Sequence, residues 1–287
     1  MSLPRTRTKR DLDDLKAAAR VMAQLAPTLP RVRDMLVARH WAERRRDLAA
    51  RNPLLSAGAK HYSQNDEDGL IAEILRRLGR TTPGTFVELG VGDGTENNTL
   101  LLLLAGWRGL WLGGEALAFE ARGRLRFSRC WITAESVVDR VRAGLEGWPT
   151  PTLASLDLDG NDWWIARTLL DHGLRPAVWI VEYNGKLPPP ISWAMTYDAD
   201  HVWRGGDHFG ASLQRFAELF DRHGYRLVCC NITGANAFFV RRDAVGDAFD
   251  DVPDDVGALF VPPDYNWFVG AGHPVDVRIV EQALLTD

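Results

Sequence analysis

The stretch that decides the fold is residues 86–95, which read FVELGVGDGT. An apolar strand with an acidic residue near its end, Glu88, leads into glycines at alternate positions, Gly90, Gly92 and Gly94. Glycine lets the backbone turn tightly and approach a ligand, because it carries no Cβ. The spacing differs from the Gly-x-Gly-x-x-Gly fingerprint of dinucleotide sites, and Glu88 would repel a pyrophosphate. The segment therefore favours a cationic ligand with an amino group, the alternative being a bare turn between strand and helix.

Apolar and helical segments alternate beyond this turn. Near-continuous apolar strands separated by helices indicate a parallel sheet that is covered on both faces. The last two strands are only four residues apart, at 233–236, which permits an antiparallel hairpin but not a parallel crossover. The sequence therefore predicts an α/β fold with a Rossmann-like, seven-stranded, mostly parallel sheet. The expected strands are 85–89, 109–112, 125–133, 153–158, 177–183, 225–232 and 237–241, and the expected helices are 97–105, 135–145, 162–174 and 210–223.

Composition excludes several classes of protein. With 46% hydrophobic and 25% charged residues over 287 positions, the chain is expected to fold without the support of disulfides or structural metals. Its three cysteines include an adjacent pair, Cys229 and Cys230, which argues against a disulfide scaffold and suits a reducing cytoplasm. No apolar run approaches the roughly 20 residues of a membrane helix, and no apolar segment follows the charged N-terminus as in a secretory signal. We expect a cytoplasmic protein that does not bind membranes.

Three parts are expected along the chain: helices over residues 1–60, a core over 61–243 and an extension over 244–287. Residues 1–51 carry a net charge of +7 (13 basic, six acidic), and residues 52–287 carry −11 (21 basic, 32 acidic). Such asymmetry raises the hypothesis of an RNA-binding arm. The basic residues are, however, interleaved with apolar ones at helical spacing, which favours a basic helical cap on the acidic core, either covering the active site or pairing two subunits. We therefore expect no nucleic-acid partner. The apolar residues are Leu15, Ala19, Met22, Leu25, Met35, Leu36 and Trp41.

Carboxylates crowd the ends of the fourth and fifth expected strands. Asp157, Asp159 and Asp162 follow the fourth strand, and Glu182 and Asn184 end the fifth. Because ligand sites of open parallel sheets lie beyond the carboxyl ends of the strands, these residues should face the same crevice as the glycine turn. Oxygen ligands of this kind suit Mg²⁺ or Mn²⁺, a general base for a hydroxyl is a second interpretation, and helix capping is a third.

His208 is the histidine with the most suggestive context, since it lies in a glycine-rich loop ahead of an expected helix, where a base or ligand would fit. The alternative is a solvated loop histidine. Glu115, near the end of the second strand, is the carboxylate available for ribose hydroxyls, and an exposed Glu at a helix start is its alternative. Motifs of the common serine hydrolases, zinc sites and NTPases are absent from the sequence.

Taken together, these segments resemble FkbM-like S-adenosylmethionine (SAM)-dependent methyltransferases of class I. The resemblance covers about residues 61–242. It departs from the family at Gly113, where the family has an acidic residue; either Glu115 makes the ribose contact or that contact is absent. The matching pieces are 62–69 (YSQNDEDG), 86–95, 106–111 (GWRGLW), 156–162, 182–184, 210–213 (GASL) and 234–240 (GANAFFV).

The resemblance implies methyl transfer from SAM to a hydroxyl of a small-molecule or saccharide acceptor, as in natural-product or polysaccharide tailoring. Alternatives are a SAM-using enzyme that catalyses cyclisation or elimination, and the RNA-binding protein. For acceptor activation we single out Asp157, Asp159 and His208, and for a metal such as Mg²⁺ or Mn²⁺ we single out Asp159, Glu182 and Asn184. The resemblance places these residues at the cofactor: Gln64, Glu88, Gly90, Gly92, Asp93, Gly94, Glu115 and Asp157.

Overall fold

A computed structural model describes residues 9–26, 28–265 and 273–285 of the chain. The chain forms two compact units, Met1–Glu43 and Arg44–Asp287. By compactness, the residues from 44 onward group with the sheet, and the division expected at residues 60 and 243 stays a prediction.

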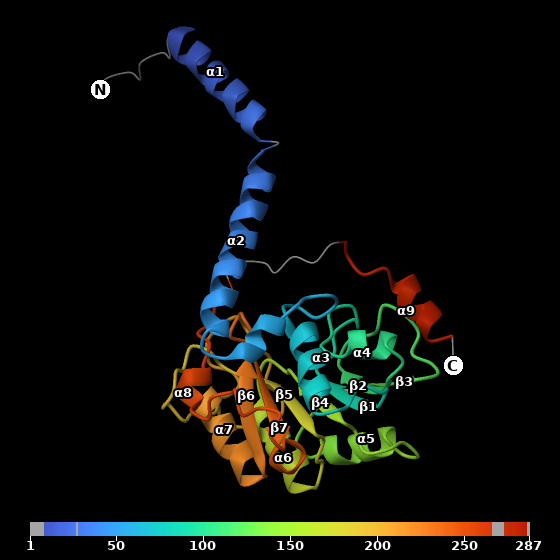
Figure 1. The fold of residues 1–287 in the computed structure, drawn as a ribbon. Helices are drawn as coiled ribbons and strands as arrows, with labels where there is room; N and C mark the ends of the chain where they lie inside the picture. Colours follow the sequence, from blue (N-terminus) through green and yellow to red (C-terminus); the bar gives the residue numbers. More distant parts are fainter. Residues whose placement is uncertain (1–8, 27, 266–272, 286–287) are drawn as a thin grey trace, which may run out of the picture. The chain divides into compact units, whose positions relative to one another are not determined.

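The larger unit is built on one seven-stranded sheet with the order β3-β2-β1-β4-β5-β7-β6 (Figure 1). Strands β1 to β5 pair in parallel, and β7 runs antiparallel between β5 and β6. The expected mostly parallel sheet and its antiparallel hairpin are confirmed. The strands are β1 (Thr85–Leu89), β2 (Arg108–Gly113), β3 (Leu125–Arg129), β4 (Leu153–Leu156), β5 (Val178–Glu182), β6 (Tyr225–Cys230) and β7 (Asn236–Arg241).

Helices α4, α5 and α6 connect β1 to β2, β3 to β4 and β4 to β5, whereas residues 114–124 join β2 to β3 without a helix. The larger unit contains α3 (Glu67–Arg77), α4 (Leu100–Leu104), α5 (Val137–Gly144), α6 (Asp162–Asp171), α7 (Leu213–Arg222), α8 (Val256–Leu259) and α9 (Val277–Ala283), with short 3-10 turns η1 (Pro53–Ala57) and η2 (Arg242–Ala244).

The core fills both faces of the sheet. Every residue of β1 and of β4 is buried, and their sequences are mainly apolar apart from Thr85, Glu88 and Ser155. At the antiparallel end, the rings of Phe220 on α7 and Phe239 on β7 stack at 4.2 Å between centroids. This packing fixes the sheet, and with it the carboxyl ends of β1, β4 and β5.

Two local features differ from expectation. The helix expected from residue 97 begins at Leu100, because the backbone N–H groups of Asn98 and Thr99 donate to the Glu88 carboxylate instead of entering a helix. The strand expected over 125–133 ends at Arg129.

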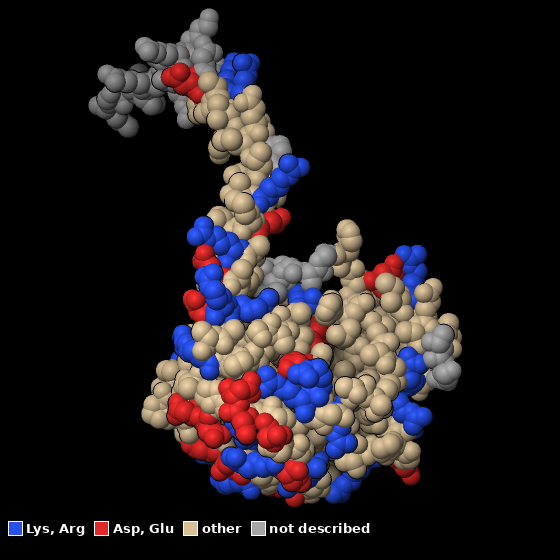
Figure 2. Space-filling view, viewed as in Figure 1, with Lys and Arg blue, Asp and Glu red and all other residues tan. Residues whose placement is uncertain are grey.

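The smaller unit is helical, with α1 (Lys9–Leu25) and the first part of α2 (Leu29–Ala49). Among the described residues, no helix combines the length and the apolar character needed to cross a membrane. In the larger unit, Figure 2 shows acidic side chains gathered over α8 with basic side chains beside them. Part of the acidic stretch is paired within this unit, since Asp251 lies 2.6 Å from Arg77 and Asp254 lies 2.9 Å from Arg226. The aromatic residues Trp267 and Phe268 of the tail lie outside the described residues.

Candidate functional site

A cavity of about 330 Å³ opens at the carboxyl ends of β1, β2 and β4. This is the edge where ligands bind in open parallel sheets, and the volume falls within the usual range for small-molecule sites. All eight residues that the sequence places at a cofactor line this cavity: Gln64, Glu88, Gly90, Gly92, Asp93, Gly94, Glu115 and Asp157. The turns after β1 and β2 thus meet the loop ahead of α3 at one site.

The glycines of the turn differ in what they accommodate. Gly90 has φ +93°, and a Cβ there would lie 1.5 Å from the carbonyl oxygen of Asp157. Gly94 also has a positive φ, of +87°. Gly92, by contrast, faces open space, with no atom within 4 Å of the place that a Cβ would occupy. Gly90 therefore lets two loops cross, whereas Gly92 leaves the cavity wall bare for a ligand.

Glu88 organises the wall of the cavity. Its carboxylate accepts hydrogen bonds from the backbone N–H groups of Asn98 (3.0 Å) and Thr99 (3.2 Å), and also from the Thr99 hydroxyl. Burial raises the pKa of Glu88 to about 7, against the lowering effect of these hydrogen bonds. Glu88 thus ties β1 to the segment ahead of α4 in addition to lining the cavity.

A carboxylate cluster lies beside the cavity. One oxygen from each of Asp157, Asp159 and Glu182 lies within 4.8 Å of the others. Within the described part of the chain, Oε2 of Glu182 is buried without a hydrogen-bond partner. Burial, together with the neighbouring carboxylates, raises the pKa of Asp157 to about 8 and that of Glu182 well above its usual value. Such a group of acids is stable only when protons are shared or a cation is bound.

The loop that carries the cluster is held in an unusual conformation. Asp159 has φ 53°, the one positive value among the non-glycine residues that the structure describes. The side chain of buried Asp162 fixes this loop by accepting the N–H groups of Leu158 (2.7 Å) and Gly160 (2.9 Å). Strained residues of this kind cluster at functional sites. Asp162 therefore supports the loop, and Asp159 projects from it.

The two remaining predicted residues do not join the cluster. The Asn184 amide nitrogen donates to the carbonyls of Asp207 (2.8 Å) and Phe209 (3.2 Å), and its oxygen accepts from the Lys186 N–H. His208 is exposed, and its ring packs edge-on against Trp193 at 5.6 Å. Asn184 thus anchors the loop that carries His208, and the carboxylates that converge are those of Asp157, Asp159 and Glu182.

A second histidine comes closer to the cluster. His201 is half-buried, packs against Gly160 and interacts electrostatically with Asp159, and its Nε2 has no hydrogen-bond partner among the described residues. It belongs to a smaller hollow of about 80 Å³ that shares Gly90 with the cavity and is lined by Trp131 and Ile132. Trp131 and Ile132 fell within the strand expected over 125–133, which ends at Arg129, and His201 lies in a segment without periodicity, so no pattern in the sequence marked these residues.

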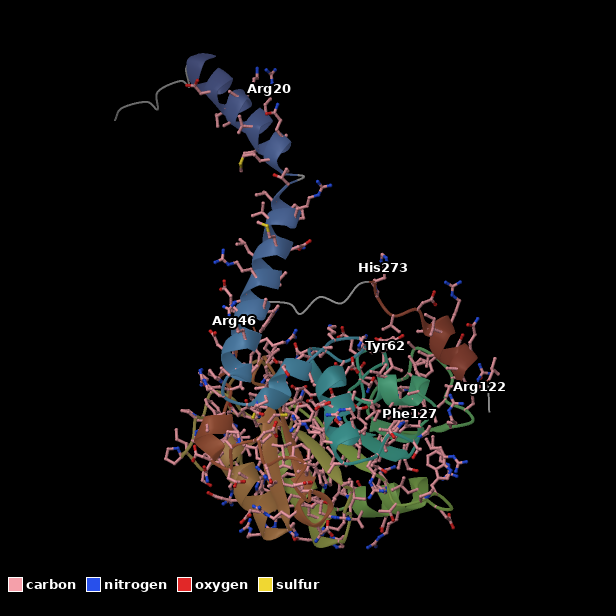
Figure 3. All side chains as sticks on the ribbon, in the orientation of Figure 1. Arg20, Arg46, Tyr62, Arg122, Phe127 and His273 are labelled. Carbon is pink, nitrogen blue, oxygen red and sulfur yellow. The ribbon has the colours of Figure 1, made fainter. Side chains whose placement is uncertain are left out.

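The loop that brings Gln64 to the cavity is shaped by the acidic start of α3. A single oxygen of Asp68 accepts from the backbone N–H groups of His61, Tyr62 and Ser63 at 2.6–2.9 Å, and also from the Ser63 hydroxyl. Figure 3 labels Tyr62 in this loop. Residues 62–69 therefore include a local hydrogen-bond network that holds the backbone immediately before Gln64.

The same helix start is tied to the β6–β7 turn. Oε1 of Glu67 accepts from the side-chain amides of Asn231 (2.7 Å) and Asn236 (3.0 Å), and Asn236 also lines the cavity. Asp68 thus positions Gln64, and Glu67 positions Asn236. Both carboxylates belong to the first turn of α3.

The departure at Gly113 has a steric cause. A Cβ at this position would lie 2.1 Å from the carbonyl oxygen of Val91, so no acidic side chain fits there. Glu115, two residues later, lies in the cavity wall. A carboxylate thus lines the cavity two residues beyond Gly113, and its contact with a ribose stays a prediction.

Comparisons with known proteins give weak likenesses. No family model matches the sequence, and no curated protein matches it. Among solved structures, the MycE methyltransferase of the mycinamycin biosynthetic pathway, in complex with Mg, SAH and mycinamycin VI, is 15% identical with a TM-score of 0.39, over 60% of this chain. The match spans about half, 49%, of the MycE chain.

Two further structures are similar at the same level. One concerns the conversion of a disulfide bond into a thioacetal group during echinomycin biosynthesis (13% identity, 59% of this chain, 80% of that one, TM-score 0.31). The other is a proposed O-methyltransferase from Klebsiella pneumoniae (13%, 71% and 90%, TM-score 0.33). The fold assignment rests on the strand order instead. The sheet has the class I methyltransferase topology.

Proposed function

We propose that the protein is a SAM-dependent O-methyltransferase that acts on a hydroxyl of a small-molecule or saccharide acceptor. The observation that carries this proposal is the meeting of the glycine-turn cavity with the carboxylate cluster at one edge of a class I methyltransferase sheet. The cavity would hold the cofactor, and the carboxylate cluster would activate an acceptor hydroxyl beside it.

The residues of the cavity fit SAM. The bare backbone at Gly92 allows close approach of the ligand, and the carboxylates of Asp93, Glu115 and Asp157 suit an amino group, ribose hydroxyls and a sulfonium. The adjoining hollow with Trp131 and Ile132 offers apolar surface for a planar base. When bound, SAM supplies an electrophilic methyl group. The chain's own residues bind and orient it, which is the main requirement of an in-line transfer.

The cluster fits a divalent cation. Asp157, Asp159 and Glu182 offer three oxygens that converge, and Oε2 of Glu182 has no other partner in the described chain. Mg²⁺ or Mn²⁺ prefers such oxygen ligands and, when bound, lowers the pKa of a hydroxyl beside it. Asp159, at the exposed end of the loop, is then placed to accept the hydroxyl proton.

Cofactor binding and product mass test the proposal. Isothermal titration should detect binding of SAM and of S-adenosylhomocysteine (SAH). A turnover assay should yield SAH together with an acceptor heavier by one CH₂ unit. Failure of both cofactors to bind rejects SAM chemistry altogether. Consumption of SAM without a methylated product supports the alternative enzyme, which uses SAM for cyclisation or elimination.

The metal is tested separately. We expect EDTA to abolish turnover and Mg²⁺ or Mn²⁺ to restore it, and we expect Glu182→Gln to lose this metal response while still binding SAH. Asn184→Asp serves as a comparison, since Asn184 is engaged with the 207–209 loop. Turnover that is unchanged by EDTA rejects the metal and leaves Asp159 as the proposed base.

We further propose a cytoplasmic location. All three cysteines are free thiols, and Cys229 and Cys230 are buried, as expected for a protein kept in a reducing compartment.

A further inference from the structure

A second and larger cleft, of about 1000 Å³, lies at the opposite edge of the sheet. It opens at the amino ends of β1 to β4, where Thr85, Arg108, Arg126 and Thr152 line it. A strand's length thus separates it from the cofactor cavity at the carboxyl ends. The proposed function makes no use of this cleft.

The lining is basic and contains no acidic residue. Three arginines contribute to it, Arg108, Arg124 and Arg126, together with Trp148. The parallel register explains why they converge: Arg108 opens β2 opposite Thr85, and Arg126 on β3 lies opposite Leu110. Figure 3 marks this end of the sheet with Arg122, in the turn before β3, and Phe127, within it. Residues 52–287 carry a net charge of −11, yet all charged residues that line this cleft are arginines.

Backbone carbonyls orient the guanidinium groups of this cleft. Arg126 donates to the carbonyls of Gly144 and Glu146, both at 2.8 Å, and its guanidinium carbon lies 4.0 Å from the centroid of the Trp148 ring. Arg124 donates to the carbonyl of Ala283 at 2.7 Å. Arg108 is exposed, and its guanidinium has no hydrogen bond or ion pair within the residues that the structure describes. A carbonyl partner orients Arg126 without cancelling its charge, and no acidic group of the described chain neutralises exposed Arg108, so both arginines keep positive charge available to a ligand.

We propose that this cleft binds the phosphoryl group of a small ligand. Arginine presents N–H donors in a fork that matches phosphate oxygens, and such charge-assisted bonds are about twice as strong as neutral ones. The hydroxyls of Thr150 and Thr152 add donors of the kind that phosphate sites use. The acidic surroundings favour a compact anion over an extended one such as RNA, because a chain that leaves the cleft would meet repulsion from the net-negative body.

Titration with inorganic pyrophosphate tests the site. The full-length protein is first saturated with SAH, so that the cofactor cavity does not contribute, and uridine diphosphate is titrated in parallel. We expect pyrophosphate to bind, and Arg108→Gln and Arg126→Gln each to weaken binding by roughly tenfold. Arg222→Gln on α7 is the matched control, because it removes the same charge from an exposed site near β6, at the far edge of the sheet from β3.

The two probes distinguish the source of the phosphoryl group. Tighter binding of uridine diphosphate than of pyrophosphate identifies a nucleotide, and equal binding identifies the phosphoryl group alone. Three results overturn the proposal: no pyrophosphate binding by the wild-type protein, equal weakening by Arg222→Gln, or binding of an RNA oligonucleotide without binding of pyrophosphate. Unfolding temperatures of the three variants, measured alongside, exclude loss of the fold as the cause.

Discussion

Gly90 occupies a position that no larger residue can take without moving a neighbouring loop. Its φ is +93°, and an added Cβ would lie 1.5 Å from the Asp157 carbonyl. We expect Gly90→Ala to lower the free energy of unfolding by about 2–4 kcal/mol, through the combined cost of backbone strain and overpacking. Urea denaturation measures the loss directly.

Gly92→Ala is the matched comparison, since its methyl group would enter open space in the cavity wall and its φ is not positive. This variant should keep wild-type stability and bind SAH more weakly, because the methyl group occupies ligand space. If Gly92→Ala is destabilised as much as Gly90→Ala, the turn is rigid throughout, and its glycines serve the fold alone.

The buried carboxyl group of Asp66 should make the free energy of unfolding depend on pH. Burial and the charge of Glu67 raise the pKa of Asp66 to about 7, and Oδ2 is buried without a hydrogen-bond partner in the described residues. In the unfolded chain the group titrates near its ordinary value of ~3.9. Between these two values the native state holds one more proton than the unfolded state, so its contribution to stability is complete at low pH and is lost as the pH rises towards 7, by roughly 1.4 kcal/mol per pH unit.

Asp66→Asn removes this titration while keeping an oxygen that can accept the Ile232 N–H. We expect the variant to gain unfolding temperature relative to the wild-type protein on going from pH 5 to pH 8. Asp221→Asn, at an exposed position on α7, is the control and should show no such trend. A constant difference between Asp66→Asn and wild type at both values would contradict a raised pKa.

At the scale of an element, the start of α3 acts on the cavity through the loop before it. Asp68 collects three backbone N–H groups and one hydroxyl, which fixes the chain that presents Gln64. We expect Asp68→Ala to raise the KM for SAM several-fold and to leave kcat less affected, because the change loosens a binding residue and not the reacting groups.

A double-mutant cycle shows whether Asp68 acts through Gln64. If it does, Asp68→Ala and Gln64→Ala each weaken SAH binding, and the double variant is little worse than either single one. Additive effects would instead assign Asp68 to general stability. Glu73→Ala, on the same helix but paired only with Arg76 and Arg77 among the described side chains, should leave SAH affinity unchanged.

Strands were the elements that the sequence predicted best. β1 has the expected bounds, and its companions differ mainly at their ends, because apolar runs between glycines and helices report burial directly. This is also why residues at strand ends, such as Gly90, Asp157 and Glu182, were correctly expected at one edge of the sheet. The parallel arrangement alone brings them together.

Loop residues could not be placed in this way. Asn184 and His208 follow β5 in sequence, yet one anchors a loop and the other packs on Trp193. His201 reaches Gly160 from a segment with no periodicity, and Trp131 enters the small hollow just beyond β3. Their positions depend on tertiary contacts that no local pattern records, so the sequence predicted the edge of the site but not its full lining.

At the scale of the whole molecule, the larger unit contains the whole lining of the cofactor cavity. Every residue of the cofactor cavity lies between Gln64 and Asn236, within the larger unit. A chain that begins at Arg44 should therefore fold and bind SAH with wild-type affinity, which circular dichroism and isothermal titration can measure. A truncated chain that folds but fails to bind SAH would show that the helices of the smaller unit contribute to the site.

The helices of the smaller unit are expected either to cover the active site or to pair two subunits, and the second alternative can be tested directly. Its helices carry exposed apolar side chains, among them Met22 (69% exposed) and Met35 (64%), within the basic segment. We propose that a second copy of the chain would supply apolar surface for these side chains and an acidic body for the basic ones. We expect Met22→Glu to reduce the mass measured by light scattering from dimer to monomer, and Gln24→Glu, which adds the same charge two residues along α1, to leave it unchanged. A monomeric wild-type protein, or equal effects of both variants, would contradict the pairing of two subunits. A charge at residue 22 acts differently from a charge at residue 24 only if the helix face that carries Met22 is buried between subunits.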